Sequence, residues 1–407
     1  MEIQTFTLPN GIRLVHKQIP GNVAHCGLYI NAGSRDETEE EHGIAHFIEH
    51  CVFKGTERRN LYQVLNRLEN VGADLNAFTT KEDTCIHASF LNPYYERTLE
   101  LISDICFHSI FPDKELLKEK EVIIDEIKSY KDTPAEQIFD DFEDLVFEGH
   151  PLGRNVLGTP KNVRKFNGDH IRKFIGRNYT TDKMVISSVG NVEMKKLIRW
   201  VMKYFSFIDG VSGNDQRITF NDYQPRQVIR KRKIFQTHCM IGATGYSLQD
   251  DRRFALAFIN NILGGPMMNS RLALALRERN GITYHIESNY VSFTDTGLFS
   301  IYFGTNREML DKAITLTHAE LDKLRKNKLG IVQLQTAKNV IIGQLALSQE
   351  SQLNQMLAMG KSFLVMDRYI DFEEINRIIL DLTAEKIQET ANEILAPDLL
   401  SSLIFQS

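Results

Sequence analysis

Two histidines and a glutamate in the segment His46-Phe-Ile-Glu49-His50 have the types and spacing of a hydrolytic metal site. On a helix, His46 and His50 lie one turn apart, so both imidazoles face the same side. Such a pair can chelate zinc through bonds of about 2.0–2.1 Å. Glu49 lies close to that face and can hold and deprotonate a metal-bound water. The pattern H-x-x-E-H also arises by chance, so a third ligand is needed to support this interpretation.

A second predicted helix carries the candidates for that third ligand. Residues 114–131 have apolar residues at helical spacing among many lysines and glutamates. Glu119 and Glu126 are seven residues apart, about two helical turns, so they share one edge of this helix. A carboxylate on that edge would complete a His2Glu site and leave the fourth position to water, as catalytic zinc requires. The alternative is that both are surface glutamates.

The surrounding sequence resembles the pitrilysin family, the inverzincins, and in size the half-length bacterial members related to the mitochondrial processing peptidase. That family has H-x-x-E-H with a glutamate ligand 76 residues after the second histidine, which is the position of Glu126 relative to His50. A supporting glutamate seven residues earlier corresponds to Glu119. The resemblance covers nearly the whole chain and rests on the segments HGIAHFIEHCVFKGTERR, GADLNAFTTKEDT, HPLGRNVLGT, SVGNV and SRLALALRERNGITY.

The resemblance implies a zinc-dependent metalloendopeptidase with one Zn2+ per chain. The metal ligands would be His46, His50 and Glu126, with Glu119 as the supporting carboxylate. Glu49 would be the general base that acts on the metal-bound water and passes the proton to the leaving amine. The implied substrates are oligopeptides or unfolded, presequence-like segments.

Two further segments are candidates for substrate binding. Asn76-Ala77 resembles the family's edge strand, which pairs with the main chain of the substrate; the alternative is the start of an ordinary strand. Glu82 lies in the same segment, and its type and position assign it no role. Arg277 and Tyr284 match an Arg and a Tyr that, by resemblance, contact substrate carbonyls or the developing oxyanion. Taken alone, they read as a surface arginine and a core tyrosine.

The elements that must position these residues are short strands and amphipathic helices. An N-terminal strand is expected to end at the turn Pro9-Asn10-Gly11. The runs richest in β-formers predict further strands, and apolar residues at helical spacing predict helices. The predicted strands are 24–32, 84–90 and 183–189, and the predicted helices are 43–54, 60–71, 94–109, 114–131 and 193–205.

The second half of the chain repeats features of the first at a nearly constant offset. His25-Cys26 recurs at His238-Cys239 (offset 213), and Phe47-Ile48 recurs at Phe258-Ile259 (offset 211). We therefore predict an α+β protein of two similar α/β sandwich domains related by internal duplication, each an antiparallel-rich sheet with helices packed on it. At the offset of 211, the three motif residues fall on Ala257, Asn260 and Asn261, so only the first domain would bind zinc. The predicted division is 1–207, a linker at 208–227, and 228–407.

The composition is that of an ordinary globular protein. Apolar residues make up 42% of the 407 residues, charged residues make up 25%, and the net charge is −5, which gives no footprint for nucleic acid. No segment is apolar enough for a membrane span. Five widely spaced cysteines and no signal peptide predict a reduced, cytoplasmic protein. Of the charged runs, Glu37 to Glu41 is expected to be a solvated turn, and Arg226 to Lys233 an edge strand.

Two alternatives to a general peptidase stay open from the sequence. One is a non-catalytic structural or partner subunit of the same family, against which the intact motif argues. The other is a dedicated processing enzyme for one peptide. Because the family builds a chamber from four such domains and this chain carries both the zinc motif and the Arg/Tyr pair, we expect a homodimer acting on peptides.

Overall fold

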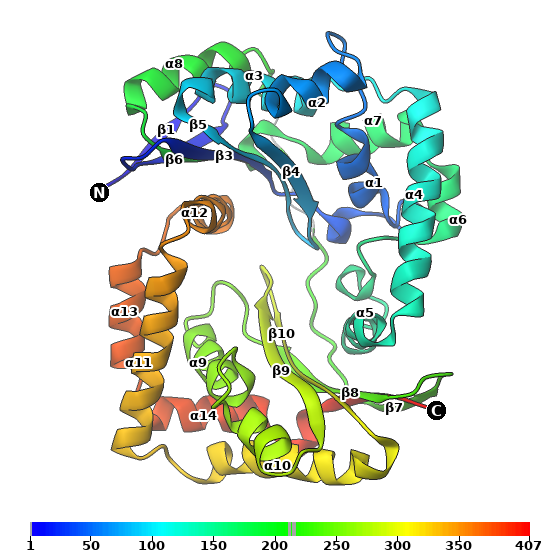
Figure 1. Ribbon diagram of the computed structural model, residues 1–407, viewed down its shortest axis with the longest axis vertical. Helices are drawn as coiled ribbons and strands as arrows, with labels where there is room; N and C mark the ends of the chain where they lie inside the picture. Colours follow the sequence, from blue (N-terminus) through cyan, green and yellow to red (C-terminus); the bar gives the residue numbers. More distant parts are fainter. Residues whose placement is uncertain (1, 211–212, 214–216) are drawn as a thin grey trace. The chain divides into compact units, whose positions relative to one another are not determined.

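The structure, a computed structural model, describes residues 2–210, 213 and 217–407 and consists of two compact units (Figure 1). Neither unit is continuous in sequence. Unit 1 contains residues 1–128, 154–217 and 348–369, and unit 2 contains residues 129–153, 218–347 and 370–407.

The units therefore depart from the predicted division, which follows chain order. Helix α5 (Pro134–Val146) lies in unit 2, and helix α12 (Gln352–Met366) lies in unit 1. The physical reason is that each helix covers a sheet face in the unit built mainly from the other half of the chain. Within the predicted linker at 208–227, residues 211–212 and 214–216 lie outside the described residues.

The sheet of unit 1 has six strands in the order β1-β2-β6-β3-β5-β4. Strands β2 and β6 run parallel, and all other neighbours run antiparallel. Strand β4 lies at one edge. The bounds are β1 Ile3–Thr7, β2 Arg13–Gln18, β3 Val23–Ile30, β4 Asp74–Thr79, β5 Thr84–Leu91 and β6 Met184–Gly190.

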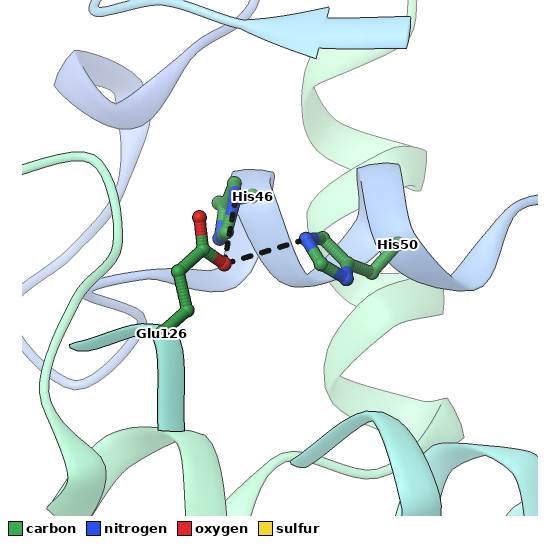
Figure 2. A group of neighbouring side chains, drawn as sticks. All are labelled: His46, His50 and Glu126. Atoms are coloured by element: carbon green, nitrogen blue, oxygen red, sulfur yellow. Dashed lines mark ion pairs between the residues drawn. The ribbon is translucent and has the colours of Figure 1, made fainter. Parts of the chain in front are cut away.

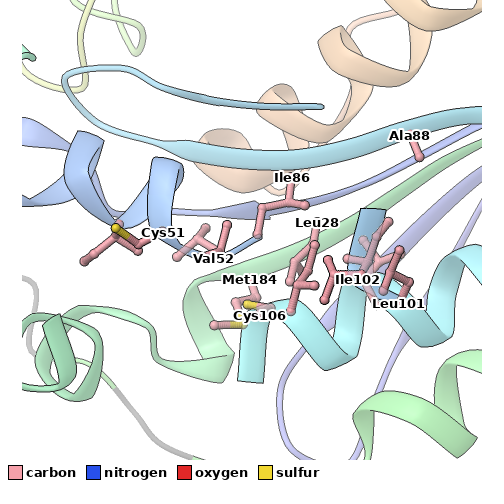
Figure 3. Close-up of a cluster of buried hydrophobic side chains, with 14 of the residues drawn as sticks. Leu28, Cys51, Val52, Ile86, Ala88, Leu101, Ile102, Cys106 and Met184 are labelled. Carbon is pink, nitrogen blue, oxygen red and sulfur yellow. The ribbon is translucent and has the colours of Figure 1, made fainter. Parts of the chain in front are cut away.

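Both faces of this sheet are covered, because successive side chains along a strand point to opposite faces. Leu14 and Leu28 pack into the main core of the unit, part of which Figure 3 shows. Their neighbours Val15 and Tyr29 pack with residues of α12 on the other face. The remaining helices of unit 1 are α1 Ile44–Cys51, α2 Leu61–Glu69, α3 Tyr95–Phe107, α4 Asp113–Asp132 (its last residues in unit 2), α6 Pro160–Lys165, α7 Gly168–Asn178 and α8 Met194–Phe205.

Unit 2 has a five-stranded sheet in the order β7-β11-β8-β10-β9. Cys239 and Ile241 face the core shared with its own helices, and Met240 between them packs with residues of α5. The strands are β7 Gln227–Lys231, β8 Thr237–Gly245, β9 Thr283–Ser292, β10 Gly297–Thr305 and β11 Ser401–Gln406. The helices are α9 Arg253–Gly264, the π-helical turn η5 Ala273–Glu278, α10 Leu310–Lys326, α11 Ile331–Ser348, α13 Phe372–Asp381 and α14 Ala384–Ile394.

The two sheets repeat one plan. The order β2-β6-β3-β5-β4 in unit 1 corresponds to β7-β11-β8-β10-β9 in unit 2. In both, the first pair is parallel and the next three pairs are antiparallel. The repeated His-Cys dipeptides lie on the corresponding strands β3 and β8. The predicted fold class of two similar α/β units is confirmed.

The predicted helices and strands are confirmed to within a few residues at their ends. The run at 226–233 contains the edge strand β7, as predicted. All five cysteines are free and buried. No helix among the described residues combines the length and the apolar character that crossing a membrane requires.

The acidic run at 37–41 was predicted to be solvated, and this is wrong for its two ends. Glu37 and Glu41 are only 4% and 6% exposed, while the three residues between them are exposed. Burial is tolerated because each end carboxylate has dedicated partners. Glu37 accepts hydrogen bonds from backbone N–H groups, and Glu41 pairs with Arg177.

Candidate metal centre

Helix α1 carries the H-x-x-E-H motif, and its remaining side chains are apolar. Its other residues, including Ile44, Phe47 and Ile48, are fully buried in the core of unit 1. This packing fixes the rotation of the helix about its axis. His46 and His50 consequently lie on one face, with ring centroids 4.6 Å apart.

Glu126 of α4 joins the two histidines. Its Oε2 atom lies 3.8 Å from Nε2 of His46 and 3.7 Å from Nε2 of His50 (Figure 2). One ligand atom from each of the three residues lies within 4.8 Å of the others. Glu126, and not Glu119, is therefore the carboxylate that groups with both histidines, a distinction that helical spacing alone left open.

The three side chains fit a zinc ion in chemistry and approximately in spacing. Two imidazole nitrogens and a carboxylate are a common donor set of catalytic zinc, and bonds near 2 Å place such donors about 3.3 Å apart in a tetrahedron. The observed ion-pair separations are a few tenths of an ångström wider. Burial, and to a smaller extent the neighbouring His50, lower the pKa of His46 to about 4. His46 is thus neutral at neutral pH, the form that binds metal.

Glu119, two turns before Glu126 on α4, contacts the second histidine from behind. Nδ1 of His50 donates to Oε2 of Glu119 at 3.2 Å, and Nζ of Lys54 lies 2.7 Å from Oε1. Burial alone would raise the pKa of Glu119, but the bonds from His50 and Lys54 hold it below its usual value. An ionised Glu119 fixes the His50 tautomer that leaves Nε2 free toward Glu126.

Glu49 does not belong to the group of three. Burial raises the pKa of its carboxyl, and interactions with Thr79 and with His50 only partly offset that rise. Thr79 is the last residue of the edge strand β4. Glu49 is half-buried and interacts electrostatically with His50.

Asn76 and Ala77 lie in β4, the edge strand of this sheet, as the sequence predicts. The side chain of Asn76 is exposed, and its Oδ1 accepts a hydrogen bond from the Ala77 N–H at 3.0 Å. Glu82 lies in the turn after β4, where its Oε1 is 2.6 Å from Nη1 of Arg35. Arg217 also approaches it, at 3.6 Å. These ion pairs account for the burial of Glu82.

Arg277 and Tyr284 both lie in unit 2. Arg277 is on η5 and lines a cavity of about 360 Å³ together with Asn260, Asn261 and residues of β9. Its Nη2 atom is buried with no hydrogen-bond partner, although Nε bonds Glu278 at 2.8 Å. Tyr284 is the second residue of β9, and 89% of it is exposed, so it is not a core residue. An unpartnered guanidinium donor and an exposed phenol are groups available to a ligand.

Three residues near the candidate metal ligands were not assigned a role at the site from the sequence. Lys54 follows His50 by four residues, a spacing that places both on one side of the chain and was available as a signal. Thr79 contacts Glu49 only through folding, so no local pattern marks it. Glu37 lies in an acidic run whose composition suggests solvent exposure, and only its burial reveals a role.

Family models match both halves of the chain. Residues 13–160 match the family described as Insulinase (Peptidase family M16). Residues 165–341 match the family described as Peptidase M16 inactive domain. The first range contains every residue of the candidate metal centre, and the second contains Arg277 and Tyr284.

Relatives and solved structures agree with these matches. "Uncharacterized zinc protease YmxG" of Bacillus subtilis is 33% identical over 407 residues, covering 100% of this chain and 98% of that protein. An "Uncharacterized zinc protease" of Rickettsia bellii is 30% identical, with 98% and 96% covered. A protease structure from Helicobacter pylori has a TM-score of 0.91 at 20% identity and full coverage of both chains. A "peptidase M16 inactive domain" structure from Pseudomonas fluorescens has a TM-score of 0.92 at 19% identity, covering 100% of this chain and 98% of that one.

Proposed function

The chain belongs to peptidase family M16, and on that premise we propose that it is a zinc-dependent endopeptidase. The observation that carries the proposal is the convergence of His46, His50 and Glu126 from two helices, with Glu49 beside them and outside the ligand group. Its relatives are named zinc proteases.

Different residues of the chain would have different roles in amide hydrolysis. His46, His50 and Glu126 would hold one zinc ion, which when bound supplies a Lewis acid that polarises the scissile carbonyl. Glu49 takes a proton from the attacking water and delivers it to the leaving amine. Burial favours this transfer, because it raises the pKa of Glu49 above the ordinary glutamate value and makes it a better proton acceptor.

Peptides in extended form suit the surfaces available. The free edge of β4 can pair with the main chain of a substrate. The Ala77 N–H, which now donates to the Asn76 side chain, would then donate to a substrate carbonyl instead. In unit 2, Arg277 and Tyr284 offer donors to other substrate carbonyls. Main-chain recognition of this kind favours oligopeptides and unfolded segments, because folded proteins have few free backbone groups.

We further propose that the working particle is a homodimer enclosing a chamber. One chain supplies two of the repeated units, and it carries both the metal residues and the Arg/Tyr pair. Two chains would supply four units and two complete sets of residues. Light scattering after size exclusion should give twice the mass of the chain, and a mass of one chain would contradict this part of the proposal.

The function is tested by cleavage of a mixed peptide library, read by mass spectrometry, with and without a chelator. We expect internal cleavage of many peptides, its loss on metal removal and its return on adding about one zinc ion per chain. Cleavage of a single peptide would instead identify a dedicated processing enzyme. No cleavage, together with less than half an equivalent of bound zinc, would favour a non-catalytic subunit.

A further inference from the structure

The turn before α1 is an acidic segment in which three carboxyl groups have separate partners. Asp36 pairs with Arg217 at 2.8 Å, and Glu41 pairs with Arg177 at 2.6 Å. Glu37, between them, has a different kind of partner: the backbone of the helix that carries His46. The segment is thus held on three sides, and one of its side chains reaches the candidate metal helix.

The Glu37 carboxylate caps the first turn of α1 with both oxygens. Oε2 accepts from the Gly43 N–H and Oε1 from the Ala45 N–H, each at 2.9 Å. The first N–H groups of a helix have no partner within it, and α1 begins after Gly43, which has no side chain to supply one.

The backbone around this cap is restricted in conformation by close contacts. Gly43 has φ of 99°, and a Cβ atom there would meet the Gly158 Cα at 2.7 Å. Arg154 Nη1 donates to the backbone carbonyl of Glu37 at 3.1 Å. The turn is therefore braced by the loop at 154–158 while its carboxylate holds the helix.

The two histidines differ in how they are held. Nδ1 of His50 bonds Glu119, whereas Nδ1 of His46 is buried and has no hydrogen-bond partner among the residues that the structure describes. His46 is the third residue of α1, directly after Ala45. Because its ring lacks an outer partner, its place depends on the position of the helix backbone in that first turn.

We propose that Glu37 is a positioning residue of the metal centre: by capping α1 at Gly43 and Ala45 it holds His46 where its ring can act as a ligand. The proposal rests on the proposed metal site. Glu37 would fix His46 through the helix backbone, whereas Glu119 fixes His50 by a hydrogen bond to its ring.

The test compares Glu37→Gln with Glu41→Gln in the full chain. Glutamine at 37 keeps one acceptor and turns an NH2 donor toward a helix N–H, so the first turn should shift. We expect zinc affinity, measured by chelator competition, to fall about tenfold, the lower end of what loss of a ligand's supporting partner costs. The visible spectrum of the Co2+-loaded variant should change as well. Glu41→Gln removes a buried acid of the same turn and should leave both readouts unchanged.

Each outcome decides the proposal. Unchanged zinc affinity and Co2+ spectrum in folded Glu37→Gln would overturn it, as would equal changes in both variants. Should Glu37→Gln fail to fold, Glu37→Asp keeps the carboxyl group but shortens the side chain, and the same comparison applies to it. Failure of the proposed function is a separate result, because the unaltered protein would then bind no zinc.

Discussion

Helices α1 and α9 occupy corresponding places in the two units, but of the two only α1 carries the candidate metal-binding histidines. Each follows the strand that lies third in the shared order, β3 or β8. His46, Glu49 and His50 on α1 correspond to Ala257, Asn260 and Asn261 on α9. The repeated fold therefore does not by itself produce the site.

The comparison extends to the helix that supplies the third ligand. In unit 1, His50 of α1 approaches Glu126 of α4 at 3.7 Å. In unit 2, Asn261 of α9 donates from Nδ2 to Oε1 of Gln344 on α11 at 2.7 Å. The contact between two helices persists, but a neutral amide pair replaces the imidazole and carboxylate. Amides are not among the side chains that bind zinc in proteins, so unit 2 keeps the packing without the metal chemistry.

The largest expected effect comes from removing a ligand in unit 1 and its counterpart in unit 2. His50→Ala should weaken zinc binding by more than the roughly 10–100-fold that loss of an outer partner costs, and should abolish peptide cleavage. Asn261→Ala is the matched control and should retain full zinc content. Zinc per chain, measured by elemental analysis after dialysis, checks both. Equal losses in the two variants would show that the units are not as different as their side chains indicate.

Loss of the proposed base comes next. Glu49→Gln should lower kcat/KM by about 10²–10⁴-fold, because the proton acceptor is removed while the ligands stay. Zinc content should match the unaltered protein, and Asn260→Ala, at the corresponding position of α9, should cleave normally. Retained turnover in Glu49→Gln would remove Glu49 from the mechanism.

The comparison can also be tested by restoring the missing ligands to unit 2. The triple variant Ala257→His, Asn261→His, Gln344→Glu should raise zinc from one to two equivalents per chain. The second equivalent should bind about 10–100-fold more weakly, because among the described contacts Asn261 has no further carboxylate partner of the kind that Glu119 provides for His50. Calorimetric titration of the metal-free protein would show one or two classes of site. A single class of zinc site with unchanged stoichiometry would mean that these three side chains do not account for the difference in metal binding between the units.

The smallest effect concerns the pH dependence of stability. Burial raises the pKa of Glu37 to about 8 from its ordinary 4.5, so the folded protein holds this proton more tightly than the unfolded chain does. The free energy of unfolding should therefore fall as pH rises from about 4.5 to about 8. Glu37→Gln should lack this component. Urea unfolding of the metal-free proteins at pH 5 and pH 8 measures it, and identical pH dependence in both would contradict the assignment.

Local patterns predicted much of the fold because they report directly on burial. Alternating apolar residues marked the strands, and the run at 114–131 predicted α4 to within a residue at each end. The exchange of α5 and α12 between the units was not predictable in this way. An amphipathic helix needs an apolar surface to cover, and no local signal says which sheet provides it.

The sequence by itself determined the helical pairing of His46 with His50, the candidate acids Glu119 and Glu126, and the repeat in which those ligands are missing. Only the tertiary structure decided which acid faces both histidines and which one supports His50 from behind. It also turned Glu37 from an apparent surface charge into the cap of α1. The physical reason is that spacing along a helix fixes which side chains share a face, whereas the packing of separate helices fixes what that face meets.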